Sequence, residues 1–180
     1  MVYLFLAPGF EEIEALCPVD IMRRAGLTVT TVGIGGREIV GSHGITVCAD
    51  VSDSELCFED IELIFLPGGM PGTKNLDASK AVHQAIDLAI EQNAYIAAIC
   101  AAPMILGKRG ILNEKEAVCY PGFENYLDGA TVPADKKIVT DGKIITAKGM
   151  GVATDLGLEI VRVFCGKEKS DALRKAIIAE

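Results

Sequence analysis

The sequence predicts a single α/β domain, in which a mostly parallel β-sheet is covered by helices on both faces. Short apolar runs bounded by Gly, Pro or Asp alternate with longer segments of helical period, as in strands joined by crossover helices. The runs are apolar at successive positions, which is typical of strands buried on both faces. With 180 residues, half of them hydrophobic, the chain is long enough to bury one substantial core, so we expect residues 1–180 to form one domain.

Five apolar runs are predicted as strands of the parallel sheet: residues 2–7, 27–34, 63–66, 94–99 and 144–147. Two segments break the alternation of strands and helices. Residues 38–47 and 136–147 have the pattern of hairpins, and the second hairpin is expected to turn at Asp141-Gly142. A few antiparallel strands are therefore expected at an edge of the sheet.

Helices are predicted where apolar residues recur at three- and four-residue spacing. The segments 82–90 and 156–164 carry such stripes, and a further helix is expected after the first strand, within residues 9–26. The final stretch, 167–180, is predicted as a terminal helix that docks on its own chain or on a partner subunit.

The charge of the chain excludes two classes of partner. The formal net charge is −8, the sequence pI is about 4.8, and the 17 Lys and Arg residues are scattered. Nucleic acid and anionic membrane surfaces are therefore not expected as partners. The first residues carry no basic leader and acidic residues arrive at Glu11, so we interpret them as a first strand and expect a cytoplasmic protein.

The six cysteines do not form a metal or disulfide framework. They are far apart, no Cys-x-x-Cys pair occurs, and only two histidines, His43 and His83, are available, both expected at the surface. We predict no metal and no cofactor. Most of the cysteines are expected to be buried, reduced core residues, in particular Cys17, Cys57 and Cys165. Cys48 and Cys119, at expected strand ends, remain open as secondary redox sites.

Cys100 is the principal candidate for a catalytic residue. It lies between the predicted strand 94–99 and a helix, and small residues flank it, as a tight strand-to-helix turn requires. Pro103 fits the first helical turn, where a missing N–H has no consequence. A sulfur at a helix N-terminus faces unpaired N–H groups, so we expect a lowered thiol pKa and a nucleophilic, oxidisable Cys100. Its place at the carboxyl end of a strand is where α/β sheets bind ligands.

A glycine turn follows the predicted strand 63–66. The successive glycines Gly68 and Gly69 let the backbone approach another group closely, with amides pointing into a cleft. Beside a nucleophile these amides, together with that of Ala101, are candidate oxyanion donors. A Pro-Gly-Gly segment is also an ordinary turn, and only its pairing with the cysteine favours the functional interpretation.

Glu14 is the best acid/base candidate in the chain. At helical spacing from Glu14, four positions on the same helix face are apolar: Pro18, Ile21, Met22 and Ala25. The carboxyl group of Glu14 therefore lies at the first position of a face that is expected to be buried. Burial raises the pKa of a carboxyl group, so Glu14 is expected to be protonated near neutrality and to donate a hydrogen bond to a thiolate. Glu11 and Glu12 are explained by favourable charge in the first turn of the helix.

Four ordered motifs support a resemblance to a known family. They are Glu-Glu-Ile-Glu ending at Glu14, with Pro-Val-Asp and Met-Arg-Arg-Ala-Gly up to Gly26; Leu-Pro-Gly-Gly ending at Gly69; Ala-Ala-Ile-Cys-Ala-Ala-Pro around Cys100; and Lys-Gly-Met-Gly ending at Gly151. With them the chain resembles the DJ-one branch of the ThiJ/PfpI family, in the class I glutamine amidotransferase-like superfamily, over nearly its whole length. The resemblance implies a flavodoxin-like sandwich, a homodimer, a nucleophilic and oxidation-sensitive Cys100, and a protonated Glu14 beside it. It also makes Gly69 and Ala101 the anion-binding amides.

Two positions depart from the family pattern. The strand-end residue that is often histidine in this branch is Tyr120 here, which makes a phenol the candidate third member of the site. A Gly-Pro-Gly segment before the last long helix is replaced by Gly149-Met150-Gly151, which alters the rim of the pocket. Ala101 stands where the peptidase branch places histidine, so peptidase activity is not expected, and no late histidine supports an amidotransferase triad.

The resemblance implies three family activities: conversion of 2-oxoaldehydes such as methylglyoxal to hydroxy acids, repair of early glycation adducts on proteins, and redox-regulated chaperoning. Our leading hypothesis is a cofactor-independent glyoxalase or deglycase, acting as a hydro-lyase or hydrolase through Cys100, with small 2-oxoaldehydes or glycated proteins as partners. The alternative is a redox sensor or stress-response chaperone that uses the same cysteine without turnover. A role in thiazole biosynthesis is disfavoured, because no phosphate-binding Gly-rich loop is recognisable.

Overall fold

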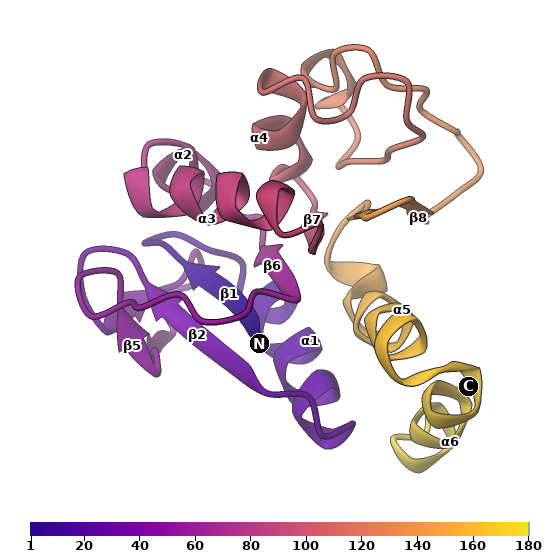
Figure 1. Cartoon of the computed structure of the whole chain (residues 1–180), viewed down its shortest axis with the longest axis horizontal. Coiled ribbons are helices and arrows are strands. Elements are labelled where there is room, and N and C mark those ends of the chain that lie inside the picture. Colours follow the sequence, from indigo (N-terminus) through magenta and orange to yellow (C-terminus); the bar gives the residue numbers. More distant parts are fainter. Residues whose placement is uncertain (180) are drawn as a thin grey trace.

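A computed structural model describes residues 1–179 and contains a seven-stranded sheet flanked by helices (Figure 1). The strand order is β5-β2-β1-β6-β7-β9-β8, with bounds β1 (Val2–Leu6), β2 (Val29–Gly33), β5 (Val51–Ser52), β6 (Leu63–Leu66), β7 (Tyr95–Ile99), β8 (Ile138–Asp141) and β9 (Ile144–Ala147). All neighbouring strands pair in parallel except β8, which is antiparallel to β9 at one edge. The five predicted strands and the predicted fold class are confirmed.

Two hairpins occur where the sequence predicts them, but only one lies in the main sheet. The hairpin β8–β9 turns through Gly142, whose φ of +59° suits glycine. The other hairpin, β3 (Glu38–Val40) and β4 (Thr46–Cys48), forms a separate two-stranded sheet. The expectation of antiparallel strands at the edge of the main sheet is therefore wrong for β3 and β4.

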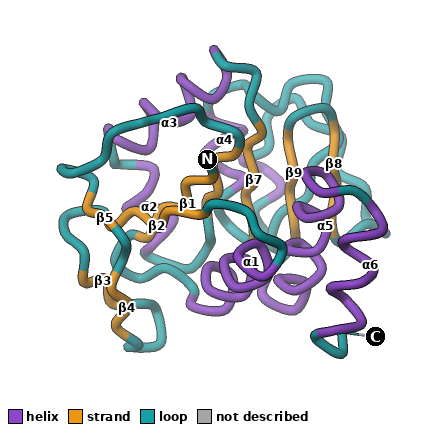
Figure 2. The backbone as a smooth tube through the Cα atoms, turned by 60° about the horizontal axis from the view of Figure 1, so that its bottom comes forward, coloured by secondary structure: helices purple, strands orange, loops and turns teal. Residues whose placement is uncertain are grey.

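The helices cover both faces of the sheet, as Figure 2 shows. Their bounds are α1 (Glu12–Arg24), α2 (Gly72–Asp77), α3 (Lys80–Glu91), α4 (Pro103–Lys108), α5 (Ala153–Cys165) and α6 (Lys167–Ala176), with 3-10 turns η1 (Glu124–Tyr126) and η2 (Met150–Val152). Side chains alternate along β1, so Tyr3 and Phe5 pack in one core with α3 and α4, whereas Leu4 and Leu6 pack in a second core with α1 and α5. The apolar runs of the sequence are thus buried on both faces.

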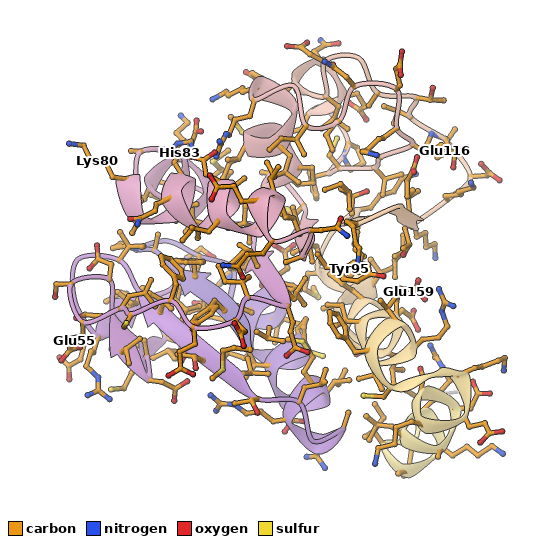
Figure 3. The ribbon with its side chains drawn as sticks, viewed as in Figure 1. Glu55, Lys80, His83, Tyr95, Glu116 and Glu159 are labelled. Carbon is orange, nitrogen blue, oxygen red and sulfur yellow. The ribbon has the colours of Figure 1, made fainter. Side chains whose placement is uncertain are left out.

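Helix α5 packs on the sheet and carries the terminal helix α6. The ring of Tyr95, which is labelled in Figure 3 at the start of β7, packs edge-on against Phe164 of α5 at a centroid distance of 5.2 Å. The Lys143 ammonium lies 4.1 Å from the centroid of the same tyrosine ring. The terminal helix α6 docks in cis on α5, where the Ser170 hydroxyl donates a 2.8 Å hydrogen bond to the Leu158 carbonyl. None of the helices within residues 1–179 is long and apolar enough to cross a membrane.

The cysteines differ from the sequence expectation. All six are free, but Cys48, Cys57 and Cys165 are exposed, and Cys119 alone is fully buried. The prediction that Cys57 and Cys165 are core residues is wrong, because Cys57 lies in the loop before β6 and Cys165 ends α5 at the surface. A cysteine inside an apolar stretch of sequence points to solvent when its position in the loop or helix faces away from the sheet.

A buried carboxylate fixes the β3–β4 hairpin to the start of α1. The side chain of Glu12 is 3% exposed, and it accepts hydrogen bonds of 2.8 Å from the backbone N–H and from the ring Nδ1 of His43. Burial alone would raise the pKa of Glu12, but the hydrogen bonds from His43 outweigh it and lower that pKa to about 2. The same pair raises the pKa of His43. His43 is exposed as predicted, whereas the burial of Glu12 was not expected.

Replacing Glu12 with Gln is expected to destabilise the fold by about 1–3 kcal/mol at pH 6, because it removes charge-assisted hydrogen bonds from a buried site. The contribution of Glu12 should be fully present above its unfolded pKa of 4.5 and be lost as the pH falls toward its folded pKa of about 2. The contribution of His43 has the opposite sign and should be lost as the pH rises through its raised folded pKa.

Urea unfolding between pH 2.5 and pH 8 measures both contributions, with Glu38→Gln as the control, since Glu38 is an exposed glutamate of the same hairpin. Equal stability changes in the two variants at pH 6 would contradict the anchoring role.

Candidate active site

Cys100 lies on a strained turn at the carboxyl end of β7. Its backbone φ is +63°, in the left-handed region that residues other than glycine rarely adopt. Two hydrogen bonds hold this conformation: the Cys100 N–H donates to the Ala147 carbonyl at 2.9 Å, and the Cys100 carbonyl accepts from the Tyr120 N–H at 2.8 Å. Helix α4 begins at Pro103, three residues later. The predicted elbow is therefore present, with a partly exposed thiol at its apex.

Glu14 reaches the elbow from α1. Its side chain is buried, with 1% exposed, and the stripe of apolar residues below it is also buried, as predicted: Pro18, Ile21, Met22 and Ala25. The carboxyl oxygen Oε2 accepts a 3.1 Å hydrogen bond from the Gly68 N–H, so this amide is engaged by Glu14 and does not serve as the oxyanion donor predicted from the sequence. The same carboxyl group is hydrogen-bonded to the Cys100 thiol, and the N–H of Met150 also points to it. Glu11 caps the helix by accepting from the Glu14 N–H at 2.6 Å.

Gly68 lies between the thiol and the carboxyl group. A Cβ atom built on Gly68 would lie 2.5 Å from Cys100 Cβ and 2.5 Å from Glu14 Oε2, distances that no real side chain tolerates. The approach of Cys100 to Glu14 therefore requires glycine at this position. Its neighbour Gly69 has a φ of +90°, which also favours glycine.

Two backbone amides point at the sulfur atom. The N–H groups of Gly69 and Ala101 both hydrogen-bond Cys100, and both act to lower the pKa of its thiol. Because α4 has only six residues, these two amides and not a long helix supply the positive potential at the sulfur. A substrate oxygen bound beside the sulfur would meet the same two donors, which is the geometry of an oxyanion hole.

The protonation states of Cys100 and Glu14 depend on each other. Burial is the main cause that raises the pKa of Glu14, to about 7. Burial and the negative charge of Glu14 raise the pKa of the Cys100 thiol to about 12, so the predicted lowering of this pKa is wrong. Protonation of Glu14 removes that charge and turns the carboxyl group into a hydrogen-bond donor to the sulfur. The thiolate therefore depends on the proton of Glu14, and the two groups titrate as a pair.

Tyr120 lies at the rim of the same site. Its ring is half exposed, and its Cδ2 atom is 3.4 Å from a Cβ built on Gly149. That Cβ position is in turn 3.8 Å from Glu14 Oε1, so Gly149 separates the phenol from the carboxyl group. The structure thus brings all of the predicted site residues together at one edge of the sheet: Cys100, Glu14, Gly68, Gly69, Ala101 and Tyr120.

Two further groups of residues do not form part of this site. Cys119 is buried, and burial raises the pKa of its thiol to about 11, which disfavours the reactive thiolate of a redox site. Glu11, Glu12 and His43 place three potential metal ligands within 4.8 Å of one another. The oxygens of Glu12 already accept hydrogen bonds from His43, so we assign this cluster to anchoring the hairpin. Sequence reasoning missed Glu12, whose buried position became evident only from the fold.

Comparisons with known proteins agree with this geometry. The model of the DJ-1/PfpI family matches residues 1–163. The chain is 34% identical over 177 residues to the protein dj-1beta of Drosophila melanogaster, covering 97% of this chain and 95% of that protein. The crystal structure of Drosophila DJ-1beta matches with a TM-score of 0.93 at 33% identity, covering 98% of this chain and 96% of that chain.

Two other similar proteins carry informative names. The glutathione-independent glyoxalase DJR-1.2 of Caenorhabditis elegans is 29% identical over 167 residues, which cover 93% of this chain and 89% of the worm protein. A structure of oxidized DJ-1 from Toxoplasma gondii matches with a TM-score of 0.89 at 31% identity, covering 98% of this chain and 97% of that chain.

Replacing Gly68 with Ala is expected to separate Cys100 from Glu14, because the new methyl group would occupy the space between them. The reactivity of Cys100 toward iodoacetamide at pH 7 should fall at least about 10-fold, since the thiolate loses its protonated partner. Gly151→Ala is the matched control, because a Cβ at Gly151 would meet no atom within 4 Å. Unchanged alkylation of Cys100 in the Gly68 variant would show that the contact is unimportant for reactivity.

Proposed function

The chain belongs to the DJ-1/PfpI family, and on that basis we propose that it is a cofactor-independent enzyme of glyoxalase or deglycase type. Its substrates are 2-oxoaldehydes such as methylglyoxal, or the early adducts that these form on proteins. The observation that carries the proposal is the pairing of Cys100 with a buried Glu14 across Gly68, beneath the amides of Gly69 and Ala101. The name of the worm relative, a glutathione-independent glyoxalase, supports the same reaction class.

The reaction starts at the sulfur atom. The Cys100 thiolate adds to the aldehyde carbon of the 2-oxoaldehyde, forming a C–S bond while the C=O electron pair moves to the oxygen. The amides of Gly69 and Ala101 stabilise this oxyanion until it takes the proton of Glu14, giving a hemithioacetal. No redox partner is consumed in this step.

Glu14 then acts as the base. The carboxylate removes the proton from the former aldehyde carbon while the ketone oxygen takes up a proton, which gives an enediol. Return of a proton to the former ketone carbon, with loss of the proton of the hemithioacetal hydroxyl, then gives a thioester of a 2-hydroxy acid. One carbon is oxidised and the other is reduced, so electrons balance within the substrate. A pKa of about 7 suits Glu14 to both giving and accepting this proton near neutral pH.

Water completes the cycle by hydrolysing the thioester to the hydroxy acid and regenerating the Cys100 thiol. Glu14 is buried, so this water must approach from the open side of the site, where Tyr120 and Gly149 form the rim. The phenol of Tyr120 is therefore the candidate group for orienting the water, in the place where the branch often has histidine.

The second candidate function is a peroxide sensor that performs no turnover. Cys100 is partly exposed, and the same amides and protonated Glu14 that stabilise a thiolate would stabilise a sulfinate formed by two equivalents of peroxide. The oxidized structure of the Toxoplasma relative favours this alternative.

Purified, reduced protein is expected to release lactate from methylglyoxal. Cys100→Ser should abolish turnover, and Glu14→Gln should lower it by about 10²–10⁴-fold, because the amide cannot transfer the proton. Glu14→Gln should still be alkylated at Cys100, since its amide N–H donates to the sulfur, whereas Glu14→Leu should lose both alkylation and turnover. Lactate is measured enzymatically, and the oxidation state of the sulfur is checked by intact mass.

Full turnover by Cys100→Ser would overturn the mechanism. No turnover by the unaltered protein, together with ready peroxide oxidation at Cys100 alone, would favour the sensor.

We also propose that the chain forms a homodimer. Exposed apolar side chains lie on the hairpin β3–β4 and on the adjoining start of α1, where Val40 is 50%, Ile45 is 56% and Ile13 is 48% exposed. The hydrogen bond between His43 and Glu12 holds the hairpin against the start of the helix. Apolar surface of this kind is typical of a site that another subunit covers.

Light scattering is expected to give a mass of twice 19.1 kDa for the unaltered chain. Ile45→Glu should shift the mass toward the monomer, because the charge would be buried at the subunit contact. Ile178→Glu, at a C-terminal position that is 85% exposed, should leave the dimer intact. A monomeric mass for the unaltered chain, or equal dissociation of both variants, would contradict this assignment.

A further inference from the structure

A cavity of about 620 Å³ lies between the start of α2, helix α4 and the turn η1. Its lining residues come from three segments: Met70, Pro71 and Lys74 after the glycine turn, Met104 of α4, and Gly122, Phe123 and Tyr126 at η1. A volume of this size is within the range of small-molecule binding sites. Methylglyoxal, with five heavy atoms, would leave most of it unfilled.

Each of the three lining segments adjoins an active-site residue, either along the chain or through a backbone hydrogen bond. Met70 follows Gly69, whose amide points at the Cys100 sulfur. The Met104 N–H donates to the Ala101 carbonyl at 3.1 Å, so this side chain lies one turn beyond the elbow. Tyr120 is bonded to the Cys100 carbonyl and in turn accepts from the Phe123 N–H at 3.0 Å. These connections are the basis for assigning the cavity to a substrate that is attached to the sulfur.

The lining is mostly apolar and aromatic. Five of its seven residues are Met, Pro, Phe or Tyr, and the Phe123 and Tyr126 rings pack together at a centroid distance of 5.9 Å. Methionine side chains such as Met70 and Met104 adapt to planar groups and make favourable contacts with aromatic rings. The cavity thus suits a flat apolar group better than a polar chain.

One cation stands at the edge of the apolar lining. The Lys74 side chain is exposed and has no carboxylate partner within residues 1–179. Its neighbour Lys108, whose ammonium is 6.0 Å from the centroid of the Tyr126 ring, is paired with Asp77 at 2.6 Å. Lys74 is therefore the group that remains to bind an anion at the far end of a ligand.

We propose that this cavity binds the substituent of the substrate, and that the protein acts on 2-oxoaldehydes whose ketone carbon carries an aromatic group ending in a carboxylate. This inference rests on the proposed glyoxalase function and specifies its substrate class. The aldehyde carbon would bond to Cys100, the ring would lie between Met104 and Phe123, and the carboxylate would reach Lys74. The chemistry at the sulfur remains the same: the thioester is hydrolysed to an arylated 2-hydroxy acid.

The test compares kcat/KM for methylglyoxal, phenylglyoxal and 4-carboxyphenylglyoxal, using consumption of the dicarbonyl and the chiral hydroxy acid as readouts. Burial of a phenyl ring should raise kcat/KM about 10- to 100-fold over methylglyoxal. The ring contact is tested with Phe123→Ala and with the more exposed Tyr126→Ala. Either variant should lower kcat/KM for phenylglyoxal about 5- to 10-fold and leave that for methylglyoxal within about 2-fold.

The charge contact is tested with Lys74→Met. It should lower kcat/KM for the carboxylated compound about 3- to 10-fold and leave that for phenylglyoxal nearly unchanged, because only the carboxylate meets the ammonium at this exposed position. The matched control is Lys137→Met, which removes an exposed lysine from the neighbouring cavity of about 410 Å³ beyond Tyr120. Equal effects of the two lysine variants, or a larger effect of Lys137→Met, would overturn the assignment of the cavity.

The failure of this inference is distinguishable from failure of the proposed function. Turnover of methylglyoxal without any preference for the aromatic compounds would overturn the substrate class alone. No turnover of any of the three dicarbonyls would overturn both.

Discussion

The hydrogen bond between the Cys100 thiol and the Glu14 carboxyl group is the interaction on which the site depends, and the sheet topology makes it possible. Strands β1, β6 and β7 are adjacent and parallel, so the three segments that follow them meet at one edge. The chain after β1 leads to Glu14, the chain after β6 leads to Gly68, and β7 leads to Cys100. A parallel sheet with another strand order would separate these residues, whatever their local sequences.

This arrangement is unfavourable for stability. A non-glycine residue in the left-handed region costs on the order of 1–3 kcal/mol, and the two backbone hydrogen bonds of Cys100 hold it there. Glu14 adds a second cost, because a group whose pKa is raised on folding binds more protons in the folded state. The contribution of Glu14 to the free energy of unfolding therefore becomes more unfavourable as the pH rises from 4.5, the pKa of this group in the unfolded chain, toward about 7, its pKa in the folded protein. Both costs are concentrated at the residues proposed to react, as expected of a site selected for chemistry.

The sequence predicts correctly those parts of the fold and of the site that a local pattern of residues determines. The apolar runs specify β1, β6, β7 and β9, and the small residues around Cys100 specify the elbow. Sequence reasoning did not predict features that depend on residues far apart in the chain or on very short elements. The burial of Glu12 depends on His43, which is 31 residues away, and β5 is too short, at two residues, to leave a pattern. The predicted direction of the Cys100 pKa shift was wrong for the same reason. The helix end is visible in the sequence, whereas the burial of the sulfur and the charge of Glu14 beside it are properties of the fold.

The same pair of residues serves an enzyme and a sensor, so the difference between the two functions must lie in the surroundings of the pair. A peroxide sensor needs only access to the sulfur, which the partial exposure of Cys100 provides. An enzyme also needs room for a substrate and a path for water. The cavity bounded by Met104 and Phe123 provides the first, and the open rim at Tyr120 and Gly149 provides the second. Because oxidation by peroxide requires neither region, the apolar cavity that we assign to the substrate has no role in oxidation, and its presence favours catalysis.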